Sequence, residues 1–141
     1  IRYDNRFLES YDISPDALET MIPKMILQPL VENAVFHGLE QRTDGGTLSV
    51  KGWIDEDDYV HFEVMDNGIG IEEQTLSQIK SLLESSQLLF TSDRKETRGN
   101  IGILNINCRI RLLYGDNSGL NIESVRNQFT KVSLFIPNKS R

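Results

Sequence analysis

Two pairs of strand-like segments lie close together in this sequence with no helix between their members. Residues 48–53 and 59–65 are separated by the acidic turn 55–58, and residues 120–125 and 129–136 by the tripeptide RNQ. Strands joined so closely pair antiparallel, because a parallel pair needs a crossover of about a dozen residues or more. The sequence therefore predicts two hairpins and argues against a doubly wound parallel sheet.

Helical patterns surround these hairpins. Ser14 followed by Pro15 matches the preferences of an N-cap and a first helical position, so a short helix is predicted there. The other predicted elements are a strand over 6–13, helices over 23–38, 72–85 and 103–114, and an irregular segment over 86–98. This order predicts a single α+β domain over residues 1–141, a two-layer α/β sandwich with a mixed, mainly antiparallel sheet and helices on one face.

The charge balance limits the partners of this domain. Fifteen Lys and Arg against 21 Asp and Glu give a net charge of −6, which argues against nucleic acid or an anionic membrane as the main partner. Any polyanionic ligand must therefore be held by local donors. The single cysteine, Cys108, excludes an internal disulfide and is predicted to be a packed core thiol. We expect a soluble cytoplasmic domain, because no apolar run approaches the roughly eighteen residues that span a bilayer.

The predicted helix over 23–38 has two different faces. Its apolar stripe is formed by Leu27, Leu30, Val31, Ala34, Val35 and Gly38. Glu32 and Asn33 point roughly the opposite way, and His37, one turn later, flanks that second face. Pro29 removes one backbone donor, so we expect a kink or a late helix start there. The second face is either a solvated polar surface or a ligand-binding one.

Two glycine-containing stretches adjoin predicted helices. In DNGIG, Gly68 and Gly70 follow a strand and permit a tight turn close to a ligand. In RGNIGILN, Gly99 and Gly102 immediately precede a predicted helix, where unpaired backbone N–H groups favour a phosphate. Taken alone, each stretch could bind a ligand or could be an ordinary turn or helix entry. The segment 86–98 between them is rich in hydroxyls and cations and is either a lid over a ligand or a solvated loop.

Together these stretches resemble a known family. LQPLVENAVFHG, DNGIG and RGNIGILN are similar to the N, G1 and G2 boxes of the histidine-kinase branch of the ATPases that include gyrase, heat-shock chaperone and mismatch-repair proteins. IPKMILQPLVENAVFHGLE together with NINCRIRLLYG is especially similar to bacterial sensor kinases of the LytS and YesM type. The resemblance spans nearly the whole chain, and it implies the Bergerat ATPase fold, which agrees with the predicted element order.

The resemblance also implies roles for individual side chains. Asn33 would hold the Mg²⁺ that bridges the ATP phosphates, and Glu32 would orient or deprotonate the attacking group. His37 lies in the same box and is assigned to the ATP site with it. Asp66 would accept a hydrogen bond from the adenine amino group, and Thr130 would support the adenine through water.

The glycines would keep the nucleotide site open. Gly68 and Gly70 would leave room in the floor of the adenine pocket, and Gly99 and Gly102 would let the lid and the helix entry approach the phosphates. One departure from the family lies next to Thr130, where Phe129 occupies a position that is glycine in many relatives.

By this resemblance the chain is the ATP-binding catalytic domain of a two-component sensor histidine kinase, which transfers the ATP γ-phosphate to a histidine. Only His37 and His61 are present; His37 belongs to the N box and His61 to a strand, where a structural role is expected. We therefore expect a fragment of a longer chain. Its implied partners are its own dimerisation and phosphoacceptor domain and a response regulator, within a parent anchored in the inner or plasma membrane. The alternatives are a nucleotide-binding regulatory module, or a serine kinase or ATPase of the same superfamily.

Overall fold

The computed structural model describes residues 7–18, 24–35, 46–85 and 101–138. The strands are β1 (Phe7–Ile13), β2 (Gly46–Ile54), β3 (Tyr59–Asp66), β4 (Gly119–Val125) and β5 (Phe129–Pro137). The helices are α1 (Pro15–Leu18), α2 (Lys24–Ala34), α3 (Glu73–Ser85) and α4 (Ile101–Tyr114).

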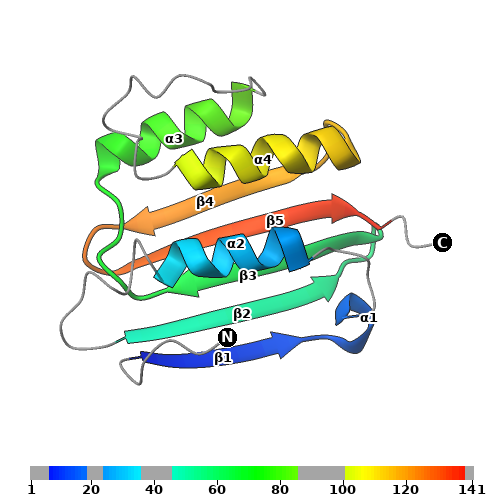
Figure 1. The fold of residues 1–141 in the computed structure, drawn as a ribbon, viewed down its shortest axis with the longest axis horizontal. Coiled ribbons are helices and arrows are strands. Elements are labelled where there is room, and N and C mark those ends of the chain that lie inside the picture. Colours follow the sequence, from blue (N-terminus) through cyan, green and yellow to red (C-terminus); the bar gives the residue numbers. More distant parts are fainter. Residues whose placement is uncertain (1–6, 19–23, 36–45, 86–100, 139–141) are drawn as a thin grey trace.

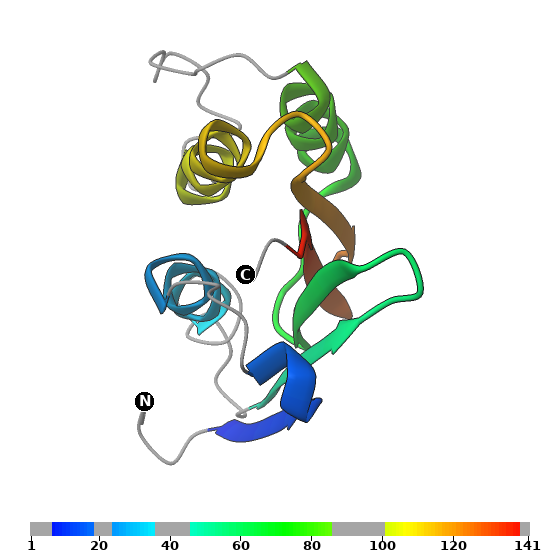
Figure 2. The same cartoon turned by 90° about the vertical axis from the view of Figure 1, so that its right-hand side faces the viewer.

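The strands form a five-stranded sheet in the order β1-β2-β3-β5-β4. β1 pairs with β2 in parallel, and every other pair is antiparallel, including both predicted hairpins, β2–β3 and β4–β5. The edge-on view shows α2 and α4 on one side of the sheet, and α3 packs against β4 and α4 (Figures 1 and 2). The predicted two-layer α+β sandwich with a mixed, mainly antiparallel sheet is confirmed.

The core lies between the sheet and the helix layer. Alternate residues of β3 are buried beneath the helices, because successive side chains of a strand point to opposite faces. From α2 and the residue after it the core receives Ile26, Leu30, Val31, Ala34 and Val35. The predicted stripe is thus confirmed for four of these residues, and Ile26, which the prediction omitted, is fully buried as well. Each large aliphatic side chain buried in this way stabilises the fold by roughly 1.5–3 kcal/mol.

The starts of two helices bear on the predictions. α2 starts at Lys24 and continues through Pro29, so of the two alternatives expected at Pro29, a kink or a late start, the late start is wrong. One lost hydrogen bond is tolerated because the helix buries so much apolar surface on both sides of the proline. α4 starts at Ile101, so Gly102 lies in its first turn rather than before it. First-turn N–H groups have no partner within the helix, so glycine costs little there.

A buried asparagine connects three elements. Asn107 of α4 is 2% exposed. Its Nδ2 donates to the Leu83 carbonyl of α3 over 3.3 Å, and its Oδ1 accepts from the Leu120 N–H of β4 over 2.9 Å. Its neighbour Cys108 is only partly buried, so the predicted core thiol is wrong. The reason is geometrical, because the buried face of α4 is centred on Ile103, Asn107 and Ile110, and Cys108 lies at its edge.

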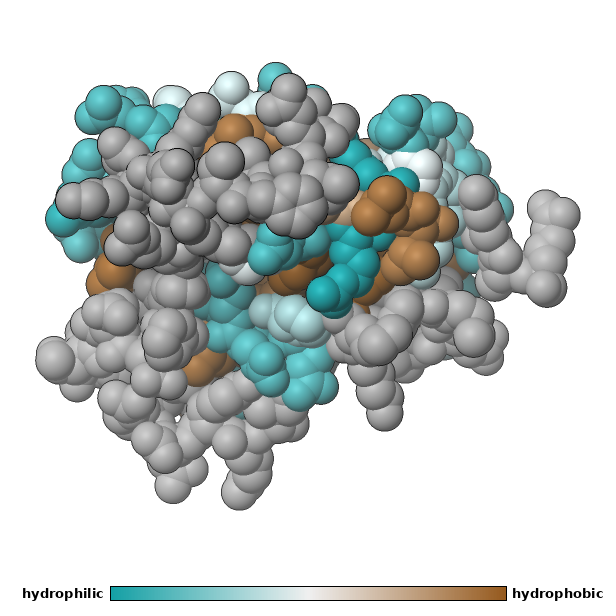
Figure 3. Space-filling model, turned by 45° about the horizontal axis from the view of Figure 1, so that its top comes forward, coloured by the Kyte–Doolittle hydropathy of each residue, from teal (hydrophilic) through white to brown (hydrophobic). Residues whose placement is uncertain are grey.

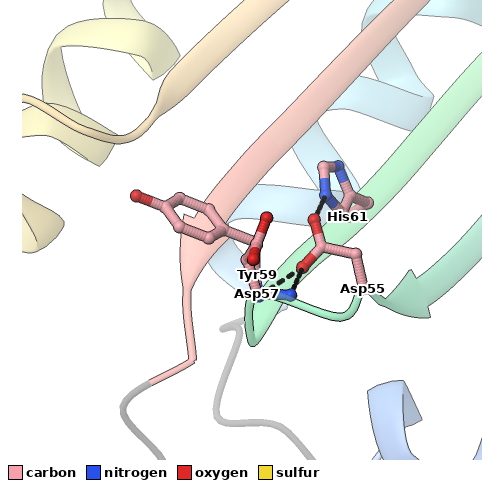
Figure 4. Close-up of polar contacts among 4 residues, drawn as sticks. All are labelled: Asp55, Asp57, Tyr59 and His61. Carbon is pink, nitrogen blue, oxygen red and sulfur yellow. Dashed lines mark hydrogen bonds and ion pairs between the residues drawn. The ribbon is translucent and has the colours of Figure 1, made fainter.

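The tip of the β2–β3 hairpin is a polar turn, as predicted. Asp55 Oδ1 accepts hydrogen bonds from the N–H groups of Asp57 at 2.9 Å and Tyr59 at 3.0 Å, and Oδ2 accepts from His61 Nε2 at 2.7 Å (Figure 4). The bond from the Tyr59 N–H, followed by that from His61, holds the pKa of Asp55 below its ordinary value. His61 also stacks on Trp53, with ring centroids 5.1 Å apart, which confirms its structural role.

Candidate functional site

A cleft of about 380 Å³ separates α2 from α4 on the helix side of the molecule. Its lining consists of Pro29, Glu32, Asn33, Gly102, Asn105, Ile106 and Arg109. On each helix these residues recur at intervals of three and four, so they form one face of α2 and one face of α4. Hydrophilic and hydrophobic surface lie next to each other on this side of the molecule, in keeping with the mixed lining (Figure 3).

Glu32 and Asn33 form the polar part of the α2 wall. Glu32 is exposed, and its Oε2 accepts a hydrogen bond from Gln28 Nε2 at 3.2 Å. Asn33 is partly buried, and a Cβ atom built on Gly102 would lie 3.5 Å from Asn33 Oδ1. The carboxamide oxygen of Asn33 therefore faces the first turn of α4, and the structure brings Glu32, Asn33 and Gly102 into one cleft.

The first turn of α4 is suited to an anion. Gly102 is exposed and is the second residue of this 14-residue helix. The first four N–H groups of an α-helix lack partners within the helix, and the helix dipole adds partial positive charge at that end. Phosphate groups bind at such helix starts. Without a side chain at Gly102, a ligand can approach this backbone closely.

Asp66, the last residue of β3, is a buried carboxylate at the same end of the molecule. It is 3% exposed and lies between Leu48 of β2 and Thr130 of β5 in the register of the sheet. Its Oδ1 accepts from the Gly68 N–H at 2.8 Å. Burial raises the pKa of Asp66 to about 6, against an ordinary value of 3.8. From the described residues Asp66 receives this one side-chain hydrogen bond, so it has acceptor capacity left for a ligand.

The turn after β3 is fitted closely to the β4–β5 turn. Gly70 has φ +72°, and a Cβ atom there would lie 2.3 Å from the Val125 carbonyl oxygen. The Asn127 N–H donates to the Ile69 carbonyl at 2.5 Å, and Arg126 forms a 3.1 Å ion pair with Glu72. Gly70 is therefore required both for its left-handed backbone and for the space it leaves.

A hydroxyl pair holds Thr130 in place next to Asp66. Ser124 Oγ lies 2.9 Å from Thr130 Oγ1, donates to the Phe129 carbonyl at 2.7 Å, and accepts from the Ile71 N–H at 2.8 Å. Sequence reasoning missed Ser124, because nothing local marks it as a neighbour of Thr130. It connects the turn after β3 to the strand that carries Thr130.

Sequence reasoning also missed Asn105 and Arg109. Both follow Gly102 on one face of α4, three and seven residues later, and that spacing was the available signal. Two predicted site residues, His37 and Gly99, and the irregular segment 86–98 lie outside the described residues. The end of the predicted helix at Gly38 lies outside them as well.

The donor set of this region fits a magnesium nucleotide. The last residue of β3, the C-terminal end of α2 and the first turn of α4 lie at one end of the molecule (Figure 1). A carboxamide oxygen such as Asn33 Oδ1 is the kind of ligand that Mg²⁺ prefers, a helix start suits phosphate, and a buried carboxylate suits adenine.

The described residues contain no cluster of three or more His, Cys, Asp or Glu side chains arranged for a metal. Within the same residues, no helix has the length and apolar character needed to cross a membrane.

Comparison with known proteins gives consistent matches. Residues 20–140 match the family described as histidine kinase-, DNA gyrase B-, and HSP90-like ATPase. The chain is 34% identical over 138 residues to the sensor protein LytS of Bacillus cereus, which covers 98% of this chain but 22% of that protein. The chain therefore spans about a fifth of the length of this relative.

Solved structures support the same fold. The catalytic domain of histidine kinase ThkA matches with a TM-score of 0.57 and 19% identity, covering 94% of this chain and 80% of that one. Full-length ShkA in complex with AMPPNP matches with a TM-score of 0.58 and 14% identity, covering 96% of this chain and 26% of that one.

Proposed function

The chain belongs to the histidine kinase-, DNA gyrase B-, and HSP90-like ATPase family, and on that premise we propose that it is the ATP-binding catalytic domain of a two-component sensor histidine kinase. The observation that carries the proposal is the cleft between α2 and α4, whose lining includes Glu32, Asn33 and Gly102. Asp66, which ends β3 at the same end of the molecule, lies outside this lining (Figure 1). In the proposal Asp66 receives the purine, and the cleft receives the phosphates.

Asp66 supplies the adenine contact in this proposal. Its buried carboxylate accepts the hydrogen bond of an exocyclic amino group, a group that guanine does not present at the same ring position. A buried acceptor left without its donor is costly, so the site discriminates against purines that lack this amino group. Thr130, held by Ser124, lies opposite Asp66 and offers a hydroxyl for a water-mediated contact.

The phosphates extend from Asp66 toward the start of α4. There Asn33 Oδ1 would ligate Mg²⁺, and the free N–H groups around Gly102 would bind phosphate oxygens. When bound, Mg²⁺ neutralises charge on the phosphates and orients them. Glu32, one residue before Asn33 and exposed at the cleft, faces the side from which a nucleophile approaches.

The reaction is transfer of the γ-phosphoryl group to an imidazole. An imidazole nitrogen forms the new bond to phosphorus while the bond to the β–γ bridging oxygen breaks, and ADP leaves. Glu32 orients the imidazole and accepts the proton from its other nitrogen, a role that a carboxylate can fill. The acceptor histidine belongs to a dimerisation domain of a longer, membrane-anchored parent, and a response regulator then receives the phosphoryl group.

Titration of Mg-ATP by calorimetry tests the nucleotide site. We expect saturable binding that Asp66→Ala weakens at least about tenfold, because the adenine amino group loses its charged acceptor. Asn33→Asp should alter the magnesium dependence of binding more than the affinity for ATP without metal. Equal affinity of wild type and Asp66→Ala would remove the adenine assignment.

Transfer is measured in a longer chain that includes the acceptor segment. Glu32→Gln should reduce the rate of transfer by about 10²- to 10⁴-fold, the usual contribution of a general base, while ATP binding stays within about twofold. Transfer that survives this substitution would exclude Glu32 as the base. A phosphoprotein stable in acid would indicate a serine kinase instead, since phosphohistidine is acid-labile, and binding without transfer would indicate a regulatory module.

A further inference from the structure

The α4 wall of the cleft carries a cation that the site described above does not use. Among the described residues lining the cleft, Arg109 is the one cationic side chain and Glu32 the one anionic side chain. We propose that the Arg109 guanidinium contacts the terminal phosphate of bound ATP, and this inference rests on the proposed function. Arg109 would thereby make the site selective for a triphosphate over a diphosphate.

The position of Arg109 along the cleft suits this contact. α2 and α4 run in opposite directions, so that Asn33 lies opposite Gly102, and Arg109 lies farther along α4 (Figure 1). Seven residues of helix correspond to about 10 Å between Gly102 and Arg109 along the axis. Side chains of a helix lean toward its N-terminus, and Arg109, Asn105 and Gly102 line the same cleft, so a long side chain at Arg109 can reach toward the start of α4. In the proposed site the phosphates lie at Asn33 and Gly102, which leaves the guanidinium available to the terminal phosphate.

The charges in the cleft favour a phosphate contact. A triphosphate entering a domain of net charge −6, next to the carboxylate of Glu32, needs positive charge close by. A guanidinium presents a planar set of donors that match phosphate oxygens, and such charge-assisted hydrogen bonds are stronger than neutral ones. The nearby Arg111 has a different role, since its Nε donates to the Ser118 carbonyl at 3.2 Å and supports the start of β4.

The test compares Mg-ATP and Mg-ADP affinities of wild type and Arg109→Met by calorimetry. Methionine keeps much of the aliphatic stem but removes the donors and the charge. We expect Mg-ATP affinity to fall about tenfold and Mg-ADP affinity to change less than about twofold. Arg109→Lys should recover part of the difference, because it restores charge without the planar fork. Lys80→Met, which removes an exposed cation from α3 outside the cleft lining, should leave both affinities unchanged.

Each other outcome has a defined meaning. Equal losses for ATP and ADP, or no loss, would overturn the Arg109 contact while leaving the nucleotide site in place. A comparable drop in Lys80→Met would overturn it too, because the effect would then come from net charge. If the wild-type chain bound neither nucleotide, the proposed function itself would fail. Arg109 has a contact of its own within the domain, so the unfolding midpoint without nucleotide is measured in parallel for wild type and Arg109→Met. Equal falls in Mg-ATP and Mg-ADP affinity that accompany a lowered midpoint would overturn the assignment in favour of a structural role.

Discussion

Asp66 and Thr130 lie directly opposite each other on β3 and β5, on the face of the sheet that the helices cover. Directly opposed residues of an antiparallel pair point to the same face, so the carboxylate and the hydroxyl are neighbours there. Burial on this face raises the pKa of Asp66 to about 6. The stability of the fold therefore depends on the ionisation of this one side chain.

The raised pKa predicts a pH dependence of the free energy of unfolding. The ordinary pKa of 3.8 applies to Asp66 in the unfolded chain, and burial raises the pKa to about 6 in the fold. The stabilisation that the protonated side chain gives to the fold is therefore fully present below pH 3.8 and is lost as the pH rises through about 6. Wild type should lose about 2 kcal/mol relative to Asp66→Asn between about pH 4 and pH 7, an order-of-magnitude figure. Urea unfolding of both proteins at the two pH values measures this. A difference that does not change with pH would contradict the prediction.

Gly102→Ala should separate stability from nucleotide binding. The new Cβ atom would lie 3.5 Å from Asn33 Oδ1, which is an ordinary contact, and alanine is a better helix former than glycine by up to about 1 kcal/mol. We expect unchanged or slightly higher stability. Mg-ATP affinity should nevertheless fall about tenfold, because the methyl group takes space beside the carboxamide oxygen and the free N–H groups. Loss of stability together with affinity would argue against this explanation.

Gly70→Ala and Gly115→Ala form a matched pair. Both glycines have positive φ, +72° and +98°, so both substitutions should cost about 1 kcal/mol of backbone strain. A Cβ atom at Gly115 meets nothing within 4 Å, whereas one at Gly70 would lie 2.3 Å from the Val125 carbonyl oxygen. Gly70→Ala should therefore destabilise by roughly 1–3 kcal/mol more than Gly115→Ala. Equal unfolding midpoints in urea would show that the contact with Val125 relaxes freely.

Removal of the Asn107 side chain should destabilise the helix layer. Asn107→Ala leaves the Leu83 carbonyl and the Leu120 N–H without their side-chain partner, which should cost about 2–4 kcal/mol in chemical unfolding. Asn105→Ala is the control, because Asn105 is exposed two residues earlier on the same helix and should change stability by less than about 0.5 kcal/mol. Similar effects of the two substitutions would contradict the role given to Asn107.

The parts of the fold that were predictable from sequence are those specified locally. The β2–β3 and β4–β5 hairpins follow from apolar alternation on either side of a short turn, so both ends of each contact lie within a few residues. The parallel pairing of β1 with β2 was not predictable in this way. Two helices lie between these strands in the chain, and only the packing of the whole helix layer determines which strand becomes the neighbour of β1.

The same distinction applies to the candidate site. Glu32, Asn33 and Asp66 belong to short stretches that are informative in combination, because their order along the chain resembles that of a known family. Ser124 contributes through a contact made across the fold with the turn after β3, and no local pattern specifies it. For Arg109 the one local signal is its helical spacing from Gly102. Asn107, a polar side chain in the core, was missed because its partners lie on other elements.

α2 contributes one face to the interior and the other to the cleft, with Val31 buried and Glu32 exposed one position later. Neighbouring positions of an α-helix differ by about 100° around its axis. If α2 packed on the sheet shifted by a single residue, Glu32 would point into the apolar core and Val31 would point toward the cleft. Changes to the packing beneath this helix therefore alter the lining of the cleft as well as the stability of the fold.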